Sequence, residues 1–315
     1  MKVKMEYIIL ILIIIALSVF LFLRNKNKTH YNLPEIAKIN EKDISKIVLH
    51  KTGTDIELLK ENDKWYINKE KFPADKEKLE AMVKDITAFN LTALVSESKN
   101  YGMYDLDKDK KIDFEIFSGN KVLLKIDIGK TASSYRHTFV KLDNDTNVYQ
   151  ANGNLRNTFD KKISDVRDKV VMNFDENITE IILNNSKKEM KISKKVSSDT
   201  TQQKNTGMPA QPEWITDKKE KVKGNEIDTL INTLKHLVCD DFVTEKTKNE
   251  FNKSIYKIDL KGNKSYSISI AEKKDDKYIA VSSENNYPFI IPEWRAKNLM
   301  KELDSIIDKE TKKNK

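Results

Sequence analysis

Cysteine, glycine and proline are scarce in this chain of 315 residues, which contains 1 Cys, 8 Gly and 6 Pro. The single cysteine, Cys239, cannot form an intramolecular disulfide or supply a metal cluster, so a disulfide scaffold is excluded. The low Gly and Pro counts exclude collagen-like repeats and Pro/Gly-rich disorder. The mean hydropathy of -0.62 excludes a polytopic membrane protein. What remains is a chain long enough for about two globular domains.

The body of the chain also lacks an excess of one charge, although the whole chain has a net charge of +8. Residues 1–28 hold five basic residues and one acidic residue, and residues 309–315 hold four Lys and one Glu. The rest is a nearly neutral mixture of Lys, Glu and Asp. A nucleic-acid binder needs a basic face that meets phosphates. We therefore predict no nucleic-acid partner.

One apolar run stands out against this polar composition. Residues 7–23 read YIILILIIIALSVFLFL, without a charge, Gly or Pro. As a helix the run is about 25 Å long, and its flanks extend it toward the ~30 Å of a hydrocarbon layer. No small-residue cleavage site or lipobox Cys follows, so we predict an uncleaved single-pass transmembrane anchor in the lipid bilayer rather than a signal peptide. The short N-terminal tail favours a cell-membrane protein with an extracytoplasmic body, although the positive charges flanking the run are nearly balanced.

An internal repeat organises the remaining sequence. The pattern I-x-x-I-[VI]-L occurs at residues 44–49 and again at residues 178–183. Each copy continues with a tryptophan, an amphipathic helix, a hairpin turn and two further strands. A last helix closes each copy, over 154–159 and 292–307. The alternating strands predict sheets with one wet face, so each copy is expected to be an α+β unit with mainly antiparallel sheets.

The predicted fold class is therefore α+β, a tandem duplication that follows one transmembrane helix. The predicted parts are an N-terminal tail (1–6), the transmembrane anchor (7–23), a polar stalk (24–40), a first α+β repeat (41–172), a second α+β repeat (173–308) with a flexible insert (194–212), and a basic tail (309–315).

Four short motifs of the first copy carry a family resemblance. They are Trp65 in a strand, Pro73-Ala74-Asp75 at a helix start, Tyr101-Gly102-Met103, and Ile128-Gly129-Lys130. In this order they resemble domain-of-unknown-function family 4340, well across about residues 44–172 and weakly across the remainder. The third motif departs from the family's Y-G-L-D pattern. The resemblance implies a membrane-anchored bacterial protein, often associated with ABC-type transport or gliding-motility accessory systems, and it supplies no catalytic residue.

Motifs that imitate chemical sites are incomplete. Gly129-Lys130-Thr131 ends like a P-loop, but Leu124 stands where the first Gly must be. Asp105, Asp107 and Asp109 begin like a calcium loop, whose Gly and bidentate Glu are then missing. The four histidines have no metal-ligand spacing. We therefore predict no nucleotide, cofactor or metal site and no enzyme, although a triad assembled by folding leaves no mark in the spacing.

The sequence favours an accessory or scaffold protein that binds a protein partner in a membrane complex, where an anchor raises the effective concentration. The alternative is a cell-envelope module that binds a glycan or small ligand. Candidate contact residues for a partner or ligand are Trp65, Tyr66 and Trp214. The competing interpretation of the two tryptophans is that they anchor a sheet against a helix. An uncharacterised enzyme is the third possibility.

Overall fold

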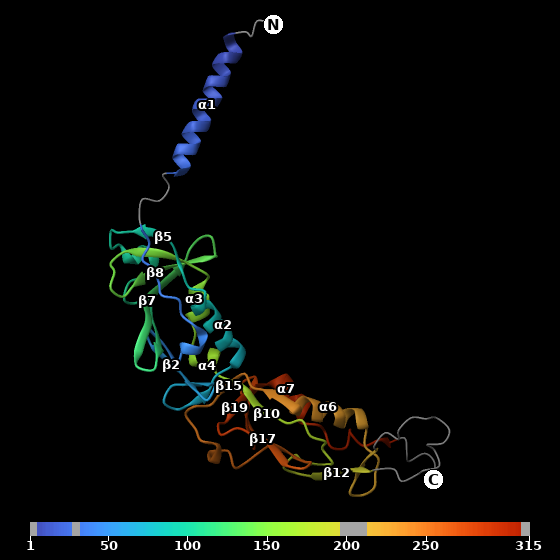
Figure 1. Ribbon diagram of the computed structural model, residues 1–315. Coiled ribbons are helices and arrows are strands. Elements are labelled where there is room, and N and C mark those ends of the chain that lie inside the picture. Colours follow the sequence, from blue (N-terminus) through green and yellow to red (C-terminus); the bar gives the residue numbers. More distant parts are fainter. Residues whose placement is uncertain (1–4, 27–31, 196–212, 310–315) are drawn as a thin grey trace. The chain divides into compact units, whose positions relative to one another are not determined.

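The structure is a computed structural model that describes residues 5–26, 32–195 and 213–309 (Figure 1). The chain divides into two compact units, Met1–Arg167 and Asp168–Lys315. Residues 196–212 of the predicted insert and residues 310–315 of the predicted basic tail lie outside the described ranges.

The first unit consists of these elements: α1 (Met5–Lys26), η1 (Glu41–Asp43), β1 (Lys46–Lys51), β2 (Thr54–Glu61), β3 (Lys64–Ile67), β4 (Phe72–Pro73), α2 (Lys76–Thr87), β5 (Leu91–Ser96), η2 (Tyr101–Tyr104), β6 (Ile112–Ser118), β7 (Lys121–Thr131), β8 (His137–Leu142), β9 (Val148–Asn152), α3 (Leu155–Phe159) and α4 (Ile163–Val166).

The second unit consists of these elements: β10 (Val170–Asn173), β11 (Glu180–Asn184), β12 (Glu189–Lys195), β13 (Glu213–Thr216), α6 (Gly224–Lys235), β14 (His236–Val238), β15 (Asp241–Phe242), η3 (Lys248–Glu250), β16 (Tyr256–Lys261), β17 (Ser265–Lys274), β18 (Lys277–Ser282), β19 (Phe289–Pro292) and α7 (Glu293–Leu299).

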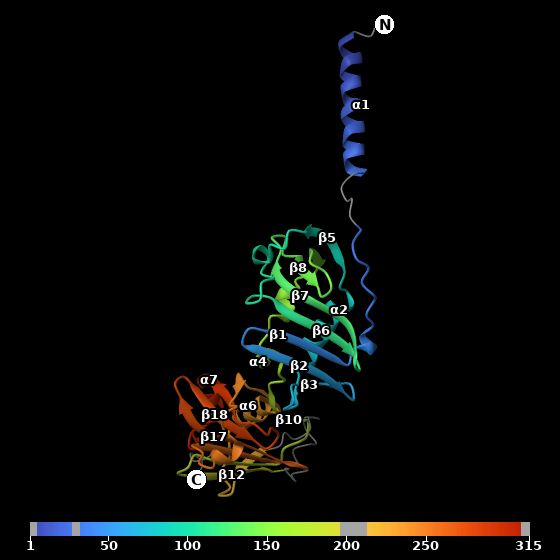
Figure 2. The ribbon, with the colours of Figure 1, turned by 90° about the vertical axis from the view of Figure 1, so that its left-hand side faces the viewer.

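Each unit is built on one large antiparallel sheet (Figure 2). The first sheet has the order β4-β3-β2-β1-β6-β7-β8-β9-β5, and the second has the order β13-β12-β11-β16-β17-β18-β19-β15. Apart from the two-residue β4, the orders correspond strand for strand, with β1 in the place of β11 and β5 in the place of β15. A short ribbon of β10 and β14 completes the second unit.

This architecture corrects the predicted α+β class, because the fold is mostly antiparallel β-sheet. The two sheets dominate both units, and most helices are single turns or short segments beside them. The amphipathic patterns on which the helical part of the α+β prediction rested correspond to α2 and α6. The predicted closing helix over 292–307 is also shorter, since α7 ends at Leu299. The buried Leu303 and Ile306 follow it in turns.

The predicted transmembrane anchor at 7–23 is a second correction. These residues are helical within α1, and the α1 side chains that the structure describes run from Ile9 to Leu21. Across the described ranges, no helix meets the length and apolarity that a membrane crossing requires. The prediction of a single-pass transmembrane helix is therefore not upheld.

The core of the first unit lies between one face of its sheet and α2. Alternate strand residues such as Ile47, Phe114 and Ile128 are buried there, while their neighbours in sequence point to the other face. Asp75 caps α2, because its carboxylate accepts a hydrogen bond from the Lys78 N–H at 3.2 Å. Alternation along the strands thus leaves the second face of the sheet open for polar residues.

Two of the family-like motifs pack directly on each other in this unit. A Cβ added to Gly129 of β7 would lie 2.2 Å from the carbonyl oxygen of Tyr104 and 2.9 Å from the Leu106 side chain. Only glycine allows β7 to pass this close beneath the segment that follows η2. The contact fixes residues 101–106 over one end of the sheet.

We expect Gly129→Ala to lower the free energy of unfolding by about 1–3 kcal/mol, because the added methyl group meets backbone that cannot yield cheaply. Gly102→Ala is the matched control, since nothing lies within 4 Å of a Cβ at that position. Urea unfolding followed by circular dichroism measures both variants. Equal stability of the two variants would contradict the close-packing argument.

Candidate functional site

A row of polar side chains crosses the open face of the first sheet. The pairing register places His50 of β1 opposite Asp113 of β6, Asp113 opposite Asp127 of β7, and Asp127 opposite Lys141 of β8. On the far side of β1, Asp55 of β2 is opposite His50, and the two side chains are hydrogen-bonded. Residues from five strands, between positions 50 and 141 of the sequence, therefore form one continuous line, which we call the charged row.

Asp127 is the central residue of the charged row and is only 8% exposed. Its two carboxylate oxygens are held by different lysines, with Lys111 Nζ 3.1 Å from Oδ1 and Lys141 Nζ 3.1 Å from Oδ2. Lys111 also donates a hydrogen bond to Asp113. A buried carboxylate needs such partners, because desolvation of an unpaired charge costs several kcal/mol. The row is thus a connected network.

The network controls the protonation of its members. Burial is the largest single effect on Asp113 and raises its pKa, but the hydrogen bonds with Lys111 and Asp127 and the charge of Lys111 together outweigh burial and leave this pKa below its ordinary value. Burial alone lowers the pKa of Lys111, whereas its hydrogen bonds to Asp113 and Asp127 leave the pKa above its ordinary value. Both groups are therefore charged at neutral pH.

A hollow of about 660 Å³ lies over the charged row. Its walls come from the β1–β2 turn, the segment after η2, and the exposed ends of β6, β7 and β8. The lining residues are His50, Lys51, Thr52, Tyr101, Leu106, Lys108, Asp109, Lys111, Asp113, Asp127 and Lys141. The contact of Gly129 with Tyr104 and Leu106 thus positions one wall of this hollow.

The second unit has no charged row at the corresponding positions. The same register there joins Asn184 to Lys257, Lys257 to Ser269, and Ser269 to Val281. These residues replace His50, Asp113, Asp127 and Lys141 in turn, so both aspartates and the β8 lysine are lost. Identical strand order therefore carries different chemistry in the two units.

Apolar side chains occupy the same region of the second unit. Phe251, which follows η3, packs with Ala271, Ile279 and Val281 in a small cluster of buried residues. Ala271 corresponds to Gly129 of the first unit. Gly129 follows Ile128, which pairs with the first residue of β6, and Ala271 follows Ile270, which pairs with the first residue of β16. We call this cluster the apolar plug.

The three contact residues predicted from the sequence lie elsewhere. Trp65 and Tyr66 are neighbours on β3, both half-buried, and Trp65 packs against the core. Trp214 on β13 is 3% exposed and belongs to the core of the second unit. The structure therefore brings Trp65 and Tyr66 together and leaves little of Trp214 accessible to a ligand.

Sequence reasoning missed the charged row. Its signal was an aspartate between two isoleucines, Ile126-Asp127-Ile128, inside an alternating strand. Asp113, Asp127 and Lys141 each lie 14 positions apart, and His50 lies far before them in the sequence, so only the register of the sheet identifies them as neighbours. Of the three aspartates considered as a calcium loop, Asp105 and Asp107 form ion pairs with Lys110, and Asp109 lines the hollow. Among the described residues, no group of three His, Cys, Asp or Glu side chains has the geometry of a metal site.

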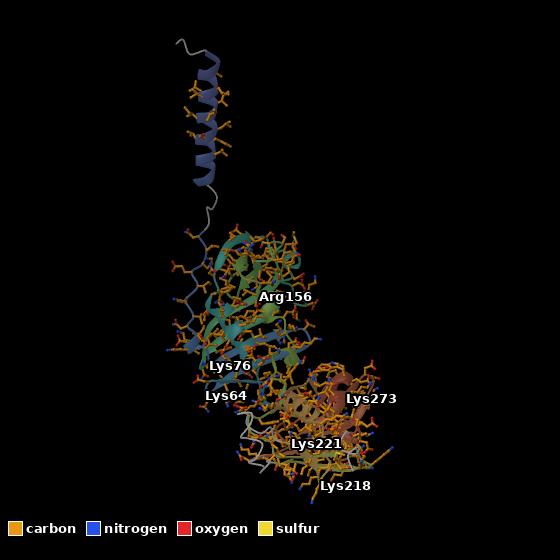
Figure 3. All side chains as sticks on the ribbon, turned by 90° about the vertical axis from the view of Figure 1, so that its right-hand side faces the viewer. Lys64, Lys76, Arg156, Lys218, Lys221 and Lys273 are labelled. Atoms are coloured by element: carbon orange, nitrogen blue, oxygen red, sulfur yellow. The ribbon has the colours of Figure 1, made fainter. Side chains whose placement is uncertain are left out.

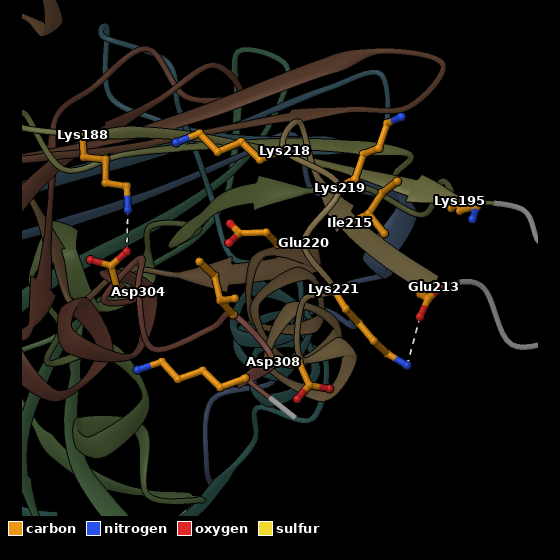
Figure 4. Close-up of a pocket in the computed structure, with 12 residues that line it drawn as sticks. Lys188, Lys195, Glu213, Ile215, Lys218, Lys219, Glu220, Lys221, Asp304 and Asp308 are labelled. Carbon is orange, nitrogen blue, oxygen red and sulfur yellow. Dashed lines mark hydrogen bonds and ion pairs between the residues drawn. The ribbon is translucent and has the colours of Figure 1, made fainter. Parts of the chain in front are cut away.

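A larger hollow of about 1250 Å³ lies in the second unit and is lined by many lysines (Figure 4). Lys221 pairs with Glu213 at 2.9 Å, and Lys188 pairs with Asp304. Six lysines and four carboxylates line the hollow, a mixture of charges that is typical of a solvated surface, so it presents a weaker case for a specific site.

Surface lysines elsewhere follow the same pattern of local pairing. Lys76 lies 3.7 Å from Glu80, and Lys273 lies 2.9 Å from Glu293 (Figure 3). Exposed pairs of this kind contribute little to stability and mark a solvated surface. The buried pairs around Asp127 differ from them in environment.

Comparison with known proteins gives one match. A family model described as Domain of unknown function (DUF4340) matches residues 65–259. The match starts at Trp65 and continues through the second unit to Asp259 of β16, well past the range of 44–172 over which the motifs suggested it. The predicted resemblance is therefore confirmed, and the match includes part of the second unit, where the motifs indicated it only weakly. No curated protein and no solved structure matches the chain.

We expect Asp113→Asn to destabilise the protein at pH 7 and to have a smaller effect at pH 3. The lowered pKa of Asp113 means that its ionised form stabilises the fold above the ordinary value of 3.8, and that this contribution is lost as the pH falls through the lower, folded-state pKa. Urea unfolding at pH 7, 5 and 3 measures the difference. Asp63→Asn, at a side chain 96% exposed, is the control and should show no such pH dependence. A constant difference at all three pH values would refute the role of Lys111.

Proposed function

This chain belongs to the DUF4340 family, and we propose that it is a binding protein whose first unit holds a segment of a protein partner in the hollow over the charged row. The observation that carries this proposal is the difference between two units of one strand order. The first places a partly buried network of ion pairs around Asp127 beneath an open hollow, and the second fills the region with the apolar plug. The fold itself therefore does not require the charges.

The chemistry of the hollow favours a partner segment that carries both signs of charge. Lys51 and Lys108 line it together with Asp109, and His50 stands at the end of the charged row. Complementary charges across an interface fix register and exclude wrong partners more than they add affinity. The expected association with an ABC-type transport assembly belongs to this proposal and indicates where the partner is to be sought.

The same network favours binding over proton-transfer chemistry. A general acid at neutral pH needs a raised pKa, whereas the pKa of Asp113 is lowered. Both oxygens of Asp127 accept from lysines, so neither is available to take a proton from a substrate without breaking an ion pair. These features support a recognition surface.

A photo-crosslinking residue at Thr52, introduced into the full chain in its native cells, is expected to trap one protein partner. Thr52 is exposed and lines the hollow. Ser186 is the matched control, because it occupies the corresponding exposed turn of the second unit. The adduct should appear with the Thr52 position alone, as read by mass spectrometry.

Charge reversal sharpens this test. Lys108→Glu in the Thr52 crosslinking chain should reduce the yield of adduct about tenfold, which corresponds to about 1.4 kcal/mol. The yield should also fall as salt is raised, because rim charges are screened. Equal adducts from Thr52 and Ser186, or a yield that Lys108→Glu leaves unchanged, would contradict the proposal.

A second candidate function is recognition of a cell-envelope glycan or small ligand, and the size of the hollow favours it. A volume of about 660 Å³ lies within the range of small-molecule sites. A ligand that binds only the folded state at about 100 times its Kd stabilises the protein by about 2.7 kcal/mol. A thermal-shift screen with envelope glycans should therefore raise the Tm of the wild type and not of Lys141→Met if this candidate is correct.

A further inference from the structure

The two large sheets have four edges, and three of them are blunted. β4 has two residues and includes Pro73, which has no N–H to offer a further strand. β15 also has two residues and begins with the charged Asp241. β13 begins with Glu213, and its Ile215 is bridged on the outer side by Lys221. Short, charged or covered edges prevent unwanted pairing with other chains.

The fourth edge, β5, has none of these protections. Its six residues, Leu91–Ser96, include no charged residue and no proline. Thr92 is exposed, and the four residues that follow are half-buried. Within the described ranges, β9 is the strand that pairs with β5, and the topology places β5 at the margin of the sheet. Two register shifts, at Thr92 and Val95, are bulges, and the twist that they give the strand is the one protection of this edge.

An edge strand without charge or proline can accept a strand from another chain through main-chain hydrogen bonds. The side chains of the edge strand then select the sequence of the added strand. Six residues correspond to about 20 Å of strand, the length of a short recognised peptide. A second copy of the chain is a poorer occupant, because a stable dimer buries about 1,200–2,000 Å² in total, more than one short edge supplies. The absence of charge on β5 favours an uncharged strand opposite it, since no ion pair would compensate a buried charge there.

We propose that β5 is a docking edge for an extended, uncharged, β-forming segment of a partner protein, which would add a tenth strand to the first sheet. The proposal rests on the sheet edge and is independent of the hollow and its charged row. The two surfaces can therefore be tested by separate variants.

The probe is a capped hexapeptide of alternating threonine and valine, added to the full chain. Fluorescence anisotropy measures its affinity, and hydrogen exchange measures protection of residues 92–96. We expect saturable binding that slows exchange in β5, and about tenfold weaker binding to Val95→Lys, equivalent to about 1.4 kcal/mol. A peptide with proline at its third position should not bind, because proline removes a donor and blocks the ladder.

Val243→Lys is the matched control, because Val243 is half-buried like Val95 and occupies the same position in the second repeat. Residues 94–97 read Leu-Val-Ser-Glu, and residues 242–245 read Phe-Val-Thr-Glu. It should leave peptide affinity unchanged. If a thermal melt shows that Val95→Lys does not fold, Thr92→Lys takes its place at the exposed position of the strand. Failure of the peptide to bind, or equal binding of the proline peptide, would overturn the proposal. A dimer in analytical ultracentrifugation that Val95→Lys converts to monomer would also overturn it and assign the edge to a second copy.

Discussion

The cross-strand register of the first sheet is the constraint on which the candidate site depends. Side chains alternate between faces with a period of two, so a one-residue slip of β7 would move Asp127 into the core and Ile128 into solvent. The burial of isoleucines on the core face therefore fixes the charges on the other face. Because β6, β7 and β8 are joined in sequence order, this one register sets the spacing of Asp113, Asp127 and Lys141 together.

The close approach at Gly129 links that register to the wall of the hollow. Tyr104 and Leu106 rest on β7 only because no side chain intervenes, and in the second unit Ala271 and Phe251 meet at the same place. Ala271 has one methyl group more than Gly129, and the region above it is filled in the second unit and open in the first. The motifs around Tyr101 and Gly129 are therefore best understood as parts of one packing contact that shapes the site.

Periodicity predicted the local elements well, and it predicted their assembly less well. The alternation around the two hairpins and the helical spacing of Leu79 to Ile86 indicated strands and a helix that the structure contains. The α+β fold class was wrong, because the helices that the sequence indicated make up a small part of two units built mostly from antiparallel sheet. The apolar run at 7–23 was predicted from hydropathy alone to be a membrane span, and the described structure does not support it. The charged row could not be predicted, since its members become neighbours only after five strands have paired.

The energetics of the charged row argue that stability is not the reason for it. Replacing a buried ion pair with well-packed apolar residues is often neutral or stabilising by about 1–4 kcal/mol. The second unit shows that this strand order can hold such a replacement, because Val281 and Phe251 are packed where the first unit has Lys141 and the hollow. The fold does not require this charged network, and the contact at Gly129 positions a wall that leaves a hollow above it. Binding of a partner in the hollow therefore explains the network better than stability of the sheet does.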